Sequence, residues 1–553
     1  MLRPTFRFYP VLFAAHPVLA LAAANPGEYA AWDLLTVLAV VVGAAAALNL
    51  VVALPLRRRW PNNIAPAITL LLIVWFFHFA WLSQLLERIG YTLTRPRTLA
   101  AMITVVALAW LIVGRPQLRR FTVFMSLLGA FLAAQLVLAI GVGQLGGARA
   151  IRQSTTVSDF AKPIQVRSDQ RHPCAQPKPD IYLLVLDGYA NAGVLRKIYG
   201  FSNERFQDSL RAFGFRIPHA VRSNYVHTHL SLASMLNLDY VTRLKADLGE
   251  RATDPSILGY LIENNRAVRF LHEQGYTFVF SPSSWWPATM QNRHADVQLQ
   301  AWPRFDLTRE LGRTDLRRVL RDQTLVSVFT APRRDADAED ILNAFRAMQD
   351  VPAMSQPTVL IAHVLAPHYP YVLDANCNPR VHRAEHTDPH PWEDHQGYLD
   401  QLLCVNRLTL KFVGDVLKRS PSLPIIILQG DHGTNTRDLA NKYSAWTVTA
   451  DEAAERFGAF GAYYLPCGQD TAFAGEVTPV NVLRKVFSTF LSADLPTRPD
   501  SFYFSVSKRP FEFVRFAAGP DGSLTGPLPN LRLITPAGRP PAATGPRSPP
   551  APP

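Results

Sequence analysis

Five apolar runs follow one another at the start of this 553-residue chain. A helix needs about 20 apolar residues to cross the roughly 30 Å hydrocarbon layer of a membrane. Each run is near that length, although the first and fourth are short. The pattern predicts an α-helical transmembrane bundle of five helices over residues 1–145, with spans at Tyr9–Ala24, Leu34–Leu56, Ile64–Leu86, Thr98–Val113 and Phe121–Val142.

Arginines between the runs predict the orientation of this bundle. They gather before the first run, at residues 57–59 and at residues 115–120, and basic loops stay on the cytoplasmic side. Only the loop with Arg88, Arg95 and Arg97 disagrees. With the N-terminus inside and an odd number of spans, we expect a multi-pass protein of the cytoplasmic membrane whose remaining residues lie outside the cytoplasm, in the periplasm.

A different pattern begins after a Gly-, Ser- and Pro-rich segment at residues 146–179, which we interpret as a linker. Short apolar runs typical of buried strands alternate with helical patterns, and this favours an α/β domain with a largely parallel central sheet over residues 180–518. The Pro-rich residues 519–553 lack periodicity and predict a disordered tail. The strands are expected at Ile181–Leu186, Tyr276–Phe280, Thr358–Val364 and Ile425–Leu428, and helices at Asn203–Phe213, Asp340–Met348 and Leu399–Leu417.

Polar residues stand where three of these strands end. Asp187 follows the first strand, His368 follows the third closely, and Asp431 and His432 follow the strand at Ile425. Parallel sheets bind their ligands at the carboxyl ends of the strands. Carboxylate and imidazole groups together suit a divalent metal ion, although a lone Asp-His-Gly also fits an ordinary polar turn.

Thr228 is the candidate nucleophile. It lies in the stretch RSNYVHTHLSLASMLN at residues 222–237, where a helical pattern begins. The helix dipole and a bound metal would both favour ionisation of its hydroxyl. A plain N-cap threonine explains the same position equally well.

Five segments in order make the chain resemble the alkaline phosphatase superfamily. They are PDIYLLVLDGYA, SNYVHTHLSLASMLNLDY, AHVLAPHYPYVLD, LQGDHG, and GAYYLPCG with the VTPVNVLRKVF and PDSFYF that follow it. The resemblance covers residues 180–504 and is to the membrane-anchored, sulfatase-like hydrolases and transferases. Five spans before an external domain are similar to the lipoteichoic acid synthase group, and phosphoethanolamine transferases share the domain.

The resemblance implies the roles of the site residues. Asp187, Thr228, Asp431 and His432 would bind one divalent ion, which ligand type leaves open between Mn, Zn and Mg. Thr228 would also be the nucleophile of a covalent phospho- or sulfo-enzyme, and His368 would contact the transferred group or protonate the leaving oxygen. The Cys/Ser-x-Pro-x-Arg stretch of ordinary sulfatases does not follow Asp187, so an arylsulfatase is disfavoured.

Three further residues near Thr228 are candidates for substrate binding. Arg222 and Asn224 are suited to phosphate oxygens, and His227 has either a substrate role or a local structural one. His363 lies inside a predicted buried strand and is interpreted as a core histidine.

Charge and cysteines narrow the picture. The net charge of +13 comes without a basic block interleaved with aromatics, so no nucleic-acid partner is expected. Of the four cysteines, Cys377 and Cys404 are the pair expected to form a disulfide in an oxidising compartment.

The expected activity is therefore metal-dependent transfer or cleavage of a phospho-substituent, of the phosphoglycerol or phosphoethanolamine type. The donor would be a membrane lipid or a lipid-linked molecule, and the acceptor a cell-envelope glycan or lipid. Two alternatives remain open: a sulfuric or phosphoric ester hydrolase on soluble substrates, and an inactive membrane scaffold or sensor that keeps the fold.

Overall fold

The structure of the protein is a computed structural model. It describes residues 8–56, 64–87, 98, 101, 103–104, 118–167, 178–218, 221–285, 288–299, 314–329, 334–354, 357–380, 391–442, 444–466, 468, 473, 475, 477–519 and 523–528.

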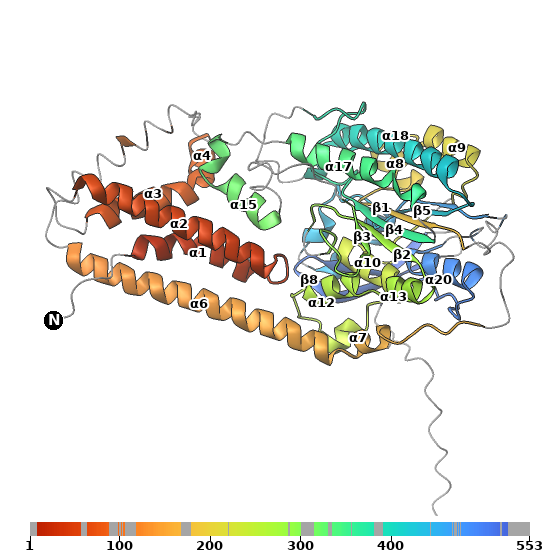
Figure 1. Cartoon of the computed structure of the whole chain (residues 1–553), viewed down its shortest axis with the longest axis horizontal. Helices are drawn as coiled ribbons and strands as arrows, with labels where there is room; N and C mark the ends of the chain where they lie inside the picture. The colour runs from red at the N-terminus through yellow and green to blue at the C-terminus, as the bar shows by residue number, and fades with distance from the viewer. Residues whose placement is uncertain are drawn as a thin grey trace, which may run out of the picture.

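Apolar helices form the N-terminal part of the molecule (Figure 1). Helix α1 packs against α2, α3 and α6, and the long α6 reaches from this bundle to the second domain. Large apolar side chains on the outer faces of α2 and α6 are exposed, Leu50 and Leu138 among them. The helices are α1 (Tyr9–Ala24), α2 (Ala31–Leu56), α3 (Ile64–Phe77), α4 (Phe79–Glu87) and α6 (Leu118–Gln153).

Two of these helices, at Ala31–Leu54 and Arg120–Gln153, are long and apolar enough to cross a membrane. The third predicted span is a pair of helices, α3 and α4, bent by 64° at His78, and it counts as one span if the pair crosses together. Helix α1 has only 16 residues. The fourth predicted span falls mostly outside the described residues, so the count of five remains a prediction.

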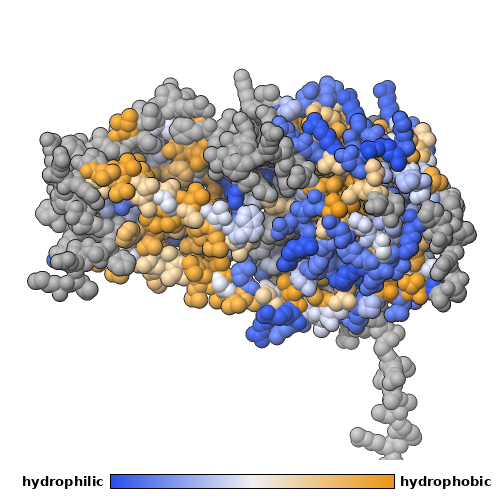
Figure 2. All heavy atoms as spheres, in the orientation of Figure 1, coloured by the Kyte–Doolittle hydropathy of each residue, from blue (hydrophilic) through white to orange (hydrophobic). Residues whose placement is uncertain are grey.

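Surface hydropathy separates the two parts of the molecule. Figure 2 shows hydrophobic residues over the helical bundle and mostly hydrophilic residues over the other domain. This is the distribution expected when lipid surrounds one part and water the other.

The second domain is built on a six-stranded sheet in the order β3-β2-β4-β1-β5-β6. All neighbouring strands are parallel except β5 and β6. The predicted fold class, apolar helices followed by an α/β domain with a largely parallel sheet, is confirmed. The strands are β1 (Ile181–Leu186), β2 (Thr277–Ser281), β3 (Val297–Gln298), β4 (Thr358–Val364), β5 (Ile425–Gly430) and β6 (Gly461–Tyr464).

Helices cover both faces of this sheet, and successive side chains of β1 therefore enter two different hydrophobic cores. Ile181, Leu183 and Val185 enter one core, while Tyr182, Leu184 and Leu186 enter the other. A strand buried on both faces has no polar alternation, which is why the run was readable in sequence. The first face carries α10 (Thr228–Asn237), α12 (Ser256–Glu263), α13 (Arg266–Glu273) and α20 (Pro479–Phe490); the second carries α8 (Ala192–Tyr199), α9 (Glu204–Ala212), α17 (Arg334–Met348) and α18 (His395–Arg419).

A smaller antiparallel sheet lies beside the segment that leads to α10. It contains β7 (Phe502–Val506), β8 (Arg509–Ala518) and β9 (Leu524–Leu528). Its side chains share a core with Val226 and with Phe457 of α19 (Ala450–Phe457). Short elements complete the fold: α7 (Thr155–Phe160), α11 (Leu244–Leu248), α15 (Asp315–Gln323), α16 (Val326–Phe329) and 3-10 turns at Val351–Ala353, Pro391–Glu393, Leu439–Asn441 and Ala445–Thr447.

Two predicted boundaries differ from the structure. Residues 146–153, expected to begin a linker, continue α6, and Ile151 near its end packs against the core of the second domain. Residues 524–528, placed in the disordered tail, form β9 against β8. Backbone pairing with an existing strand orders this Pro- and Gly-containing stretch, which has no periodic signal of its own. Residues 529–553 lie outside the described chain.

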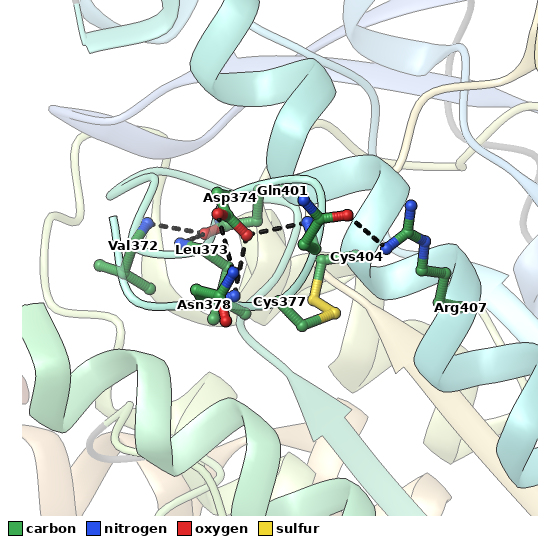
Figure 3. The surroundings of a disulfide bond; sticks show 9 residues. Val372, Leu373, Asp374, Cys377, Asn378, Gln401, Cys404 and Arg407 are labelled. Carbon is green, nitrogen blue, oxygen red and sulfur yellow. Dashed lines mark hydrogen bonds between the residues drawn. A yellow bond between two sulfur atoms is a disulfide. The ribbon is translucent and has the colours of Figure 1, made fainter. Parts of the chain in front are cut away.

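The predicted Cys377–Cys404 disulfide is present, with an S–S distance of 2.02 Å (Figure 3). It joins the loop after His368 to α18. On the same helix, Gln401 accepts hydrogen bonds from the backbone N–H groups of Val372 and Leu373 and donates to the carbonyl of His368 at 2.8 Å. The loop that carries His368 is thus attached to α18 covalently and by hydrogen bonds. Cys174 and Cys467 lie outside the described residues.

Replacing Cys377 and Cys404 together by alanine should destabilise the α/β domain by about 3 kcal/mol, because the bond closes a loop of 27 residues. Differential scanning calorimetry of the purified protein should show a lower melting temperature. The singly substituted Cys377→Ala protein is the matched control, since it loses the same bond. An unchanged melting temperature in both variants would contradict a structural role for the bond.

Candidate metal centre

The candidate centre lies where β1, β4 and β5 end side by side. Leu186 of β1 is in register with Val364 of β4 and Gly430 of β5. The residues that follow these positions therefore leave the sheet at one level. This brings Asp187 and Asp431 together. Asp431 Oδ1 accepts a hydrogen bond at 3.0 Å from the N–H of Gly188, which lies 243 positions earlier in the sequence.

The glycines around Asp431 and His432 are required by close backbone approach. A Cβ at Gly430 would lie 2.6 Å from the carbonyl oxygen of Tyr189. A Cβ at Gly433 would lie 2.1 Å from the carbonyl oxygen of Glu455. Any side chain at either position would push the Asp431–His432 pair away from the sheet.

Thr228 reaches the same point from the first residue of α10. Its Oγ1 lies 3.0 Å from His432 Nε2. The N-cap of the helix is His227, and no side chain caps the helix by a hydrogen bond. The N-cap interpretation of Thr228 therefore does not hold: its hydroxyl faces the imidazole instead of the helix terminus.

Four side chains converge on one small volume. His432 Nε2 lies 3.2 Å from Asp431 Oδ2 and 3.6 Å from Asp187 Oδ1, in addition to its contact with Thr228. Ligand atoms bound at about 2.0–2.1 Å to a tetrahedral ion stand roughly 3.3–3.4 Å apart. These three distances all involve His432 Nε2. Among the described residues, ligand atoms within 4.8 Å of one another form two groups: Asp187 with His368 and His432, and Asp187 with His363 and Asp431. Asp187 belongs to both, so the donor set around it fits a divalent ion.

Buried oxygens without a hydrogen bond support the same reading. Among the described residues, Asp187 Oδ1 and Asp431 Oδ2 have no hydrogen-bond partner, although both side chains are buried. The other Asp431 oxygen accepts from the Gly188 and His432 N–H groups, which leaves Oδ2 aimed into the centre. A buried carboxylate without a partner is costly, and a cation is the usual solution.

The two carboxyl groups titrate in opposite directions. Burial, followed by the charge of Asp187, raises the pKa of Asp431 to about 7. Burial disfavours ionisation of Asp187 as well, but its imidazole neighbours, His368 foremost, hold the pKa of Asp187 below its ordinary value. Two carboxylates in one buried site cannot both ionise cheaply, so the pair lacks a positive charge that a divalent ion would supply.

His432 is held as a neutral ligand. Burial, and after it the nearby Arg456 guanidinium, keep the pKa of His432 well below its ordinary value. Its Nδ1 lies 3.0 Å from the Gly433 carbonyl, which orients Nε2 towards the centre. Arg456, itself buried, donates to the same carbonyl at 2.8 Å. Sequence reasoning missed Arg456, which carries no motif signal in its helix.

His368 stands at the exposed side of the centre. Its Nδ1 lies 2.6 Å from the Tyr369 carbonyl, so Nε2 is the nitrogen available to the site. With Asp187 and His432 it forms a group whose ligand atoms all lie within 4.8 Å of one another. Trp392 packs edge-on to the ring with centroids 4.8 Å apart. This position suits contact with a substrate as the sequence predicted.

His363 lies in the centre too, contrary to its interpretation as an ordinary core histidine. Its Nε2 is 3.4 Å from Asp187 Oδ2 and, among the described residues, has no hydrogen-bond partner. Its Nδ1 lies 3.0 Å from the Thr289 hydroxyl, which contacts Ser283 Oγ at 2.7 Å. His363 is the last residue but one of β4 and is in register with Val185, two residues before Asp187. This position at a strand end is the sequence signal that could have identified His363 as a site residue.

The predicted substrate residues are placed less favourably. Asn224 uses its amide to bond Ser501 and Tyr240, and its carbonyl oxygen accepts from Val480. His227 Nε2 lies 2.9 Å from the Ser505 carbonyl, and burial lowers the pKa of His227 to about 3. Arg222 lies over the ring of Phe502. The structure brings none of the three to the four converging ligands, and their substrate role remains a prediction.

A cavity of about 280 Å³ opens beside Thr228 and Asp187. The walls come from the loop after β2, from the loop that carries His368, and from α15 and α17. Polar and aromatic groups alternate around it, and they include Ser283, Trp285, Arg318, Asp337, Asp340 and Tyr369. The cavity gives a substrate direct access to the Thr228 hydroxyl.

Comparison with known proteins gave matches among solved structures, while no family model and no curated protein matches the chain. The periplasmic domain of EptC from Escherichia coli, in a complex with Zn, is 10% identical, with 66% of this chain and 96% of that chain covered and a TM-score of 0.39. The lipooligosaccharide phosphoethanolamine transferase EptA from Neisseria meningitidis, an integral membrane protein, is 13% identical over 89% and 96%, with a TM-score of 0.35.

The lipoteichoic acid synthase LtaP from Listeria monocytogenes is 14% identical over 65% of this chain and 81% of that chain, with a TM-score of 0.34. Phosphoethanolamine transferases and lipoteichoic acid synthase are the groups that the sequence resembles. At these identities and TM-scores the likenesses carry no argument about activity, which has to be made from the chain's own side chains.

Metal binding should displace a proton from Asp431 when the pH lies below its pKa. Because that pKa is raised to about 7, the metal-free carboxyl is largely protonated at pH 6 and ionised at pH 8.5. In a Thr228→Ala protein, which has no hydroxyl proton to lose, binding should release about one proton per ion at the lower pH and nearly none at the higher. Calorimetric titration with Zn²⁺ in two buffers of different ionisation enthalpy measures this. Equal release at both pH values would contradict it.

The Thr289 hydroxyl should orient His363 beside Asp187. Thr289→Val keeps the buried volume but removes the contact with Nδ1, and we expect metal affinity to fall by about 10- to 100-fold, as for other groups that orient a ligand. Thr289→Ser keeps the hydroxyl and serves as the matched control. Competition titrations with a chelator provide the affinities. Wild-type affinity in the valine variant would show that His363 needs no such orientation.

Proposed function

We propose that the protein is a membrane-anchored enzyme, with an extracytoplasmic catalytic domain, that transfers a phospho-substituent through Thr228. The observation that carries the proposal is the Thr228 hydroxyl 3.0 Å from His432 Nε2, within a buried carboxylate pair and at the floor of a cavity. A bound divalent ion would lower the pKa of this hydroxyl and stabilise charge on the transferred group.

Each step has a residue to perform it. Thr228 Oγ, whose proton has already been released to water, attacks phosphorus in the donor and forms a phosphothreonine, while the bond from phosphorus to the leaving oxygen breaks. The protonated His368, on the open side, donates the proton on Nε2 to that oxygen. In the second half, the neutral His368 takes the proton of an acceptor hydroxyl, whose oxygen attacks the phosphothreonine; the bond from phosphorus to Thr228 Oγ breaks and Thr228 is restored in its ionised form. Donor and acceptor thus exchange one phospho group and one proton.

Position relative to the membrane favours transfer between envelope molecules. The catalytic domain follows apolar helices that are long enough to cross a membrane. The Cys377–Cys404 bond is typical of an oxidising compartment outside the cytoplasm. We therefore propose a donor of the phosphoglycerol or phosphoethanolamine type in a membrane lipid or lipid-linked molecule, and a cell-envelope lipid or glycan as the acceptor.

The covalent intermediate is the decisive test. Incubation of the protein with Zn²⁺ or Mn²⁺ and vesicles of phosphatidylethanolamine or phosphatidylglycerol should add the mass of the transferred group to the peptide that contains Thr228. Thr228→Ala should lose the adduct and at least about 1,000-fold in rate, since it lacks the nucleophile. Thr228→Ser, the matched control, should keep both in reduced measure.

Intact mass spectrometry and peptide mapping detect the adduct, and circular dichroism checks that each variant is folded. Turnover in Thr228→Ala at the wild-type rate would overturn the assignment of the nucleophile. Release of the phospho group only to water, with every acceptor tried, would favour the soluble-ester hydrolase instead. Absence of bound metal and of any turnover would favour the inactive scaffold.

A further inference from the structure

Helix α15 lies between the N-terminal helices and the domain that contains the six-stranded sheet (Figure 1). It contacts α1 and α4 of the helical bundle. The residue Arg318 in the same helix lines the cavity beside Thr228. This short helix, from the middle of the soluble sequence, therefore connects the two parts of the molecule.

An ion pair between the buried Asp33 and the partly exposed Arg317 holds α15 against the bundle. Asp33, in the first turn of α2, is fully buried, and its Oδ1 lies 2.5 Å from Arg317 Nε. Thr314 donates its hydroxyl to Asp33 Oδ2 at 2.6 Å, and the same hydroxyl caps α15 by accepting the Arg317 N–H at 3.3 Å. We call these three residues, Asp33, Thr314 and Arg317, the α15 anchor. They define where the helix begins and how it is rotated.

Apolar and backbone contacts extend the anchor. Leu316 is buried in a cluster with Val18, Ala22, Tyr29 and Leu34 of the bundle. The Leu325 N–H donates to the Phe76 carbonyl at 3.0 Å, immediately before the bend between α3 and α4. A bend exposes helix carbonyls that need donors, so this contact joins the segment to a second membrane helix.

The orientation of α15 that pairs Arg317 with Asp33 turns the next residue, Arg318, towards the cavity. Successive helix residues point about 100° apart, so with Arg317 facing Asp33, Arg318 faces the neighbouring side, where the cavity lies. An arginine fork matches the oxygens of a phosphate in geometry and charge. The cavity also contains Thr228, which places a phosphate-binding group and the candidate nucleophile around one space.

The orientation predicted from the arginines puts the anchor at the height of lipid headgroups. If the N-terminus is in the cytoplasm and α1 leads outwards, α2 begins at the outer surface, and Asp33 in its first turn lies at the outer edge of the hydrocarbon layer. Helix α15 is apolar at Leu316 and Leu320, towards the bundle, and basic at Arg317, Arg318 and Arg321. In this orientation a phospholipid headgroup of the outer leaflet would lie level with α15.

We propose that Arg318 binds the phosphate of a membrane phospholipid beside Thr228, and that the α15 anchor is the device that positions it. The membrane domain would then act on substrate binding and not only as a tether. The inference rests on the proposed function, because it takes the cavity at Thr228 as the reaction site. Asp33, Thr314 and Arg317 are positioning residues, and Arg318 alone contacts the lipid.

Binding is measured apart from turnover. In the full-length Thr228→Ala protein loaded with Zn²⁺, a short-chain phosphatidylglycerol should bind by calorimetry, and adding Arg318→Gln should weaken binding by about tenfold or more, since a charged hydrogen bond is lost. Arg318→Lys should recover part of the affinity. Arg321→Gln is the matched control, because Arg321 lies on the same helix but is not among the described residues that line the cavity.

Measurements of KM and kcat distinguish an effect on substrate binding from an effect on the chemical step. With phosphatidylglycerol vesicles, Arg318→Gln, Arg317→Gln and Asp33→Asn should raise KM by about tenfold and leave kcat within a factor of about three. Asp33→Asn with Arg317→Gln should be no worse than either alone, as for two partners of one contact. Hydrogen exchange of residues 314–329 should speed up in Asp33→Asn and Arg317→Gln only.

The outcomes are distinct. Phospholipid binding without any turnover would sink the proposed function and leave the binding inference intact. Undiminished binding in Arg318→Gln, or binding of inorganic phosphate as tight as that of the lipid, would overturn the role of Arg318. Unchanged hydrogen exchange in Asp33→Asn and Arg317→Gln would overturn the anchor. If Arg321→Gln lost as much phospholipid affinity as Arg318→Gln, the effect would come from the general surface charge, and the specific role of Arg318 would be overturned.

Discussion

Two buried carboxylates that lie together without a counter-charge are the constraint on which the candidate metal centre depends. Asp187 and Asp431 end neighbouring strands, and the register of β1 with β5 leaves them no room to separate. Each keeps one oxygen without a hydrogen-bond partner among the described residues. The opposite shifts of their pKa values are the electrostatic sign of this conflict, and a divalent cation between them resolves it.

The surrounding structure keeps this arrangement rigid. Tyr398 of α18 accepts the Ala190 N–H and donates to the Gly188 carbonyl, and so holds the turn after Asp187. Gln401 of the same helix holds the loop of His368, and the Cys377–Cys404 bond secures that loop further. One helix therefore positions groups that come from two separate strands. Such outer contacts prepare a site before any ligand binds.

The candidate metal centre is also connected to the helical bundle through α15. The cavity beside Thr228 is bounded by α15, whose Arg317 pairs with the buried Asp33 in the first turn of α2. A buried Asp33 without this partner would be costly, so the pair ties the α15 segment to the helical bundle. The position of the Thr228 hydroxyl relative to the bundle thus depends on specific side chains and not only on chain connectivity.

Local pattern was enough to predict the strands at β1, β4 and β5 and the polar residues at the strand ends, because buried parallel strands read as continuous apolar runs. It also predicted the helices α9, α17 and α18, but not α8, α12 or α13. The contacts between residues far apart in the sequence depend on the order of the strands in the sheet. The 3.0 Å contact of Thr228 with His432, the approach of His363 to Asp187, and the use of Asn224 as a structural amide each join residues more than 70 positions apart. Such pairings follow from which helices pack on which face of the sheet. That choice depends on the fit of whole surfaces, which no short stretch of sequence contains.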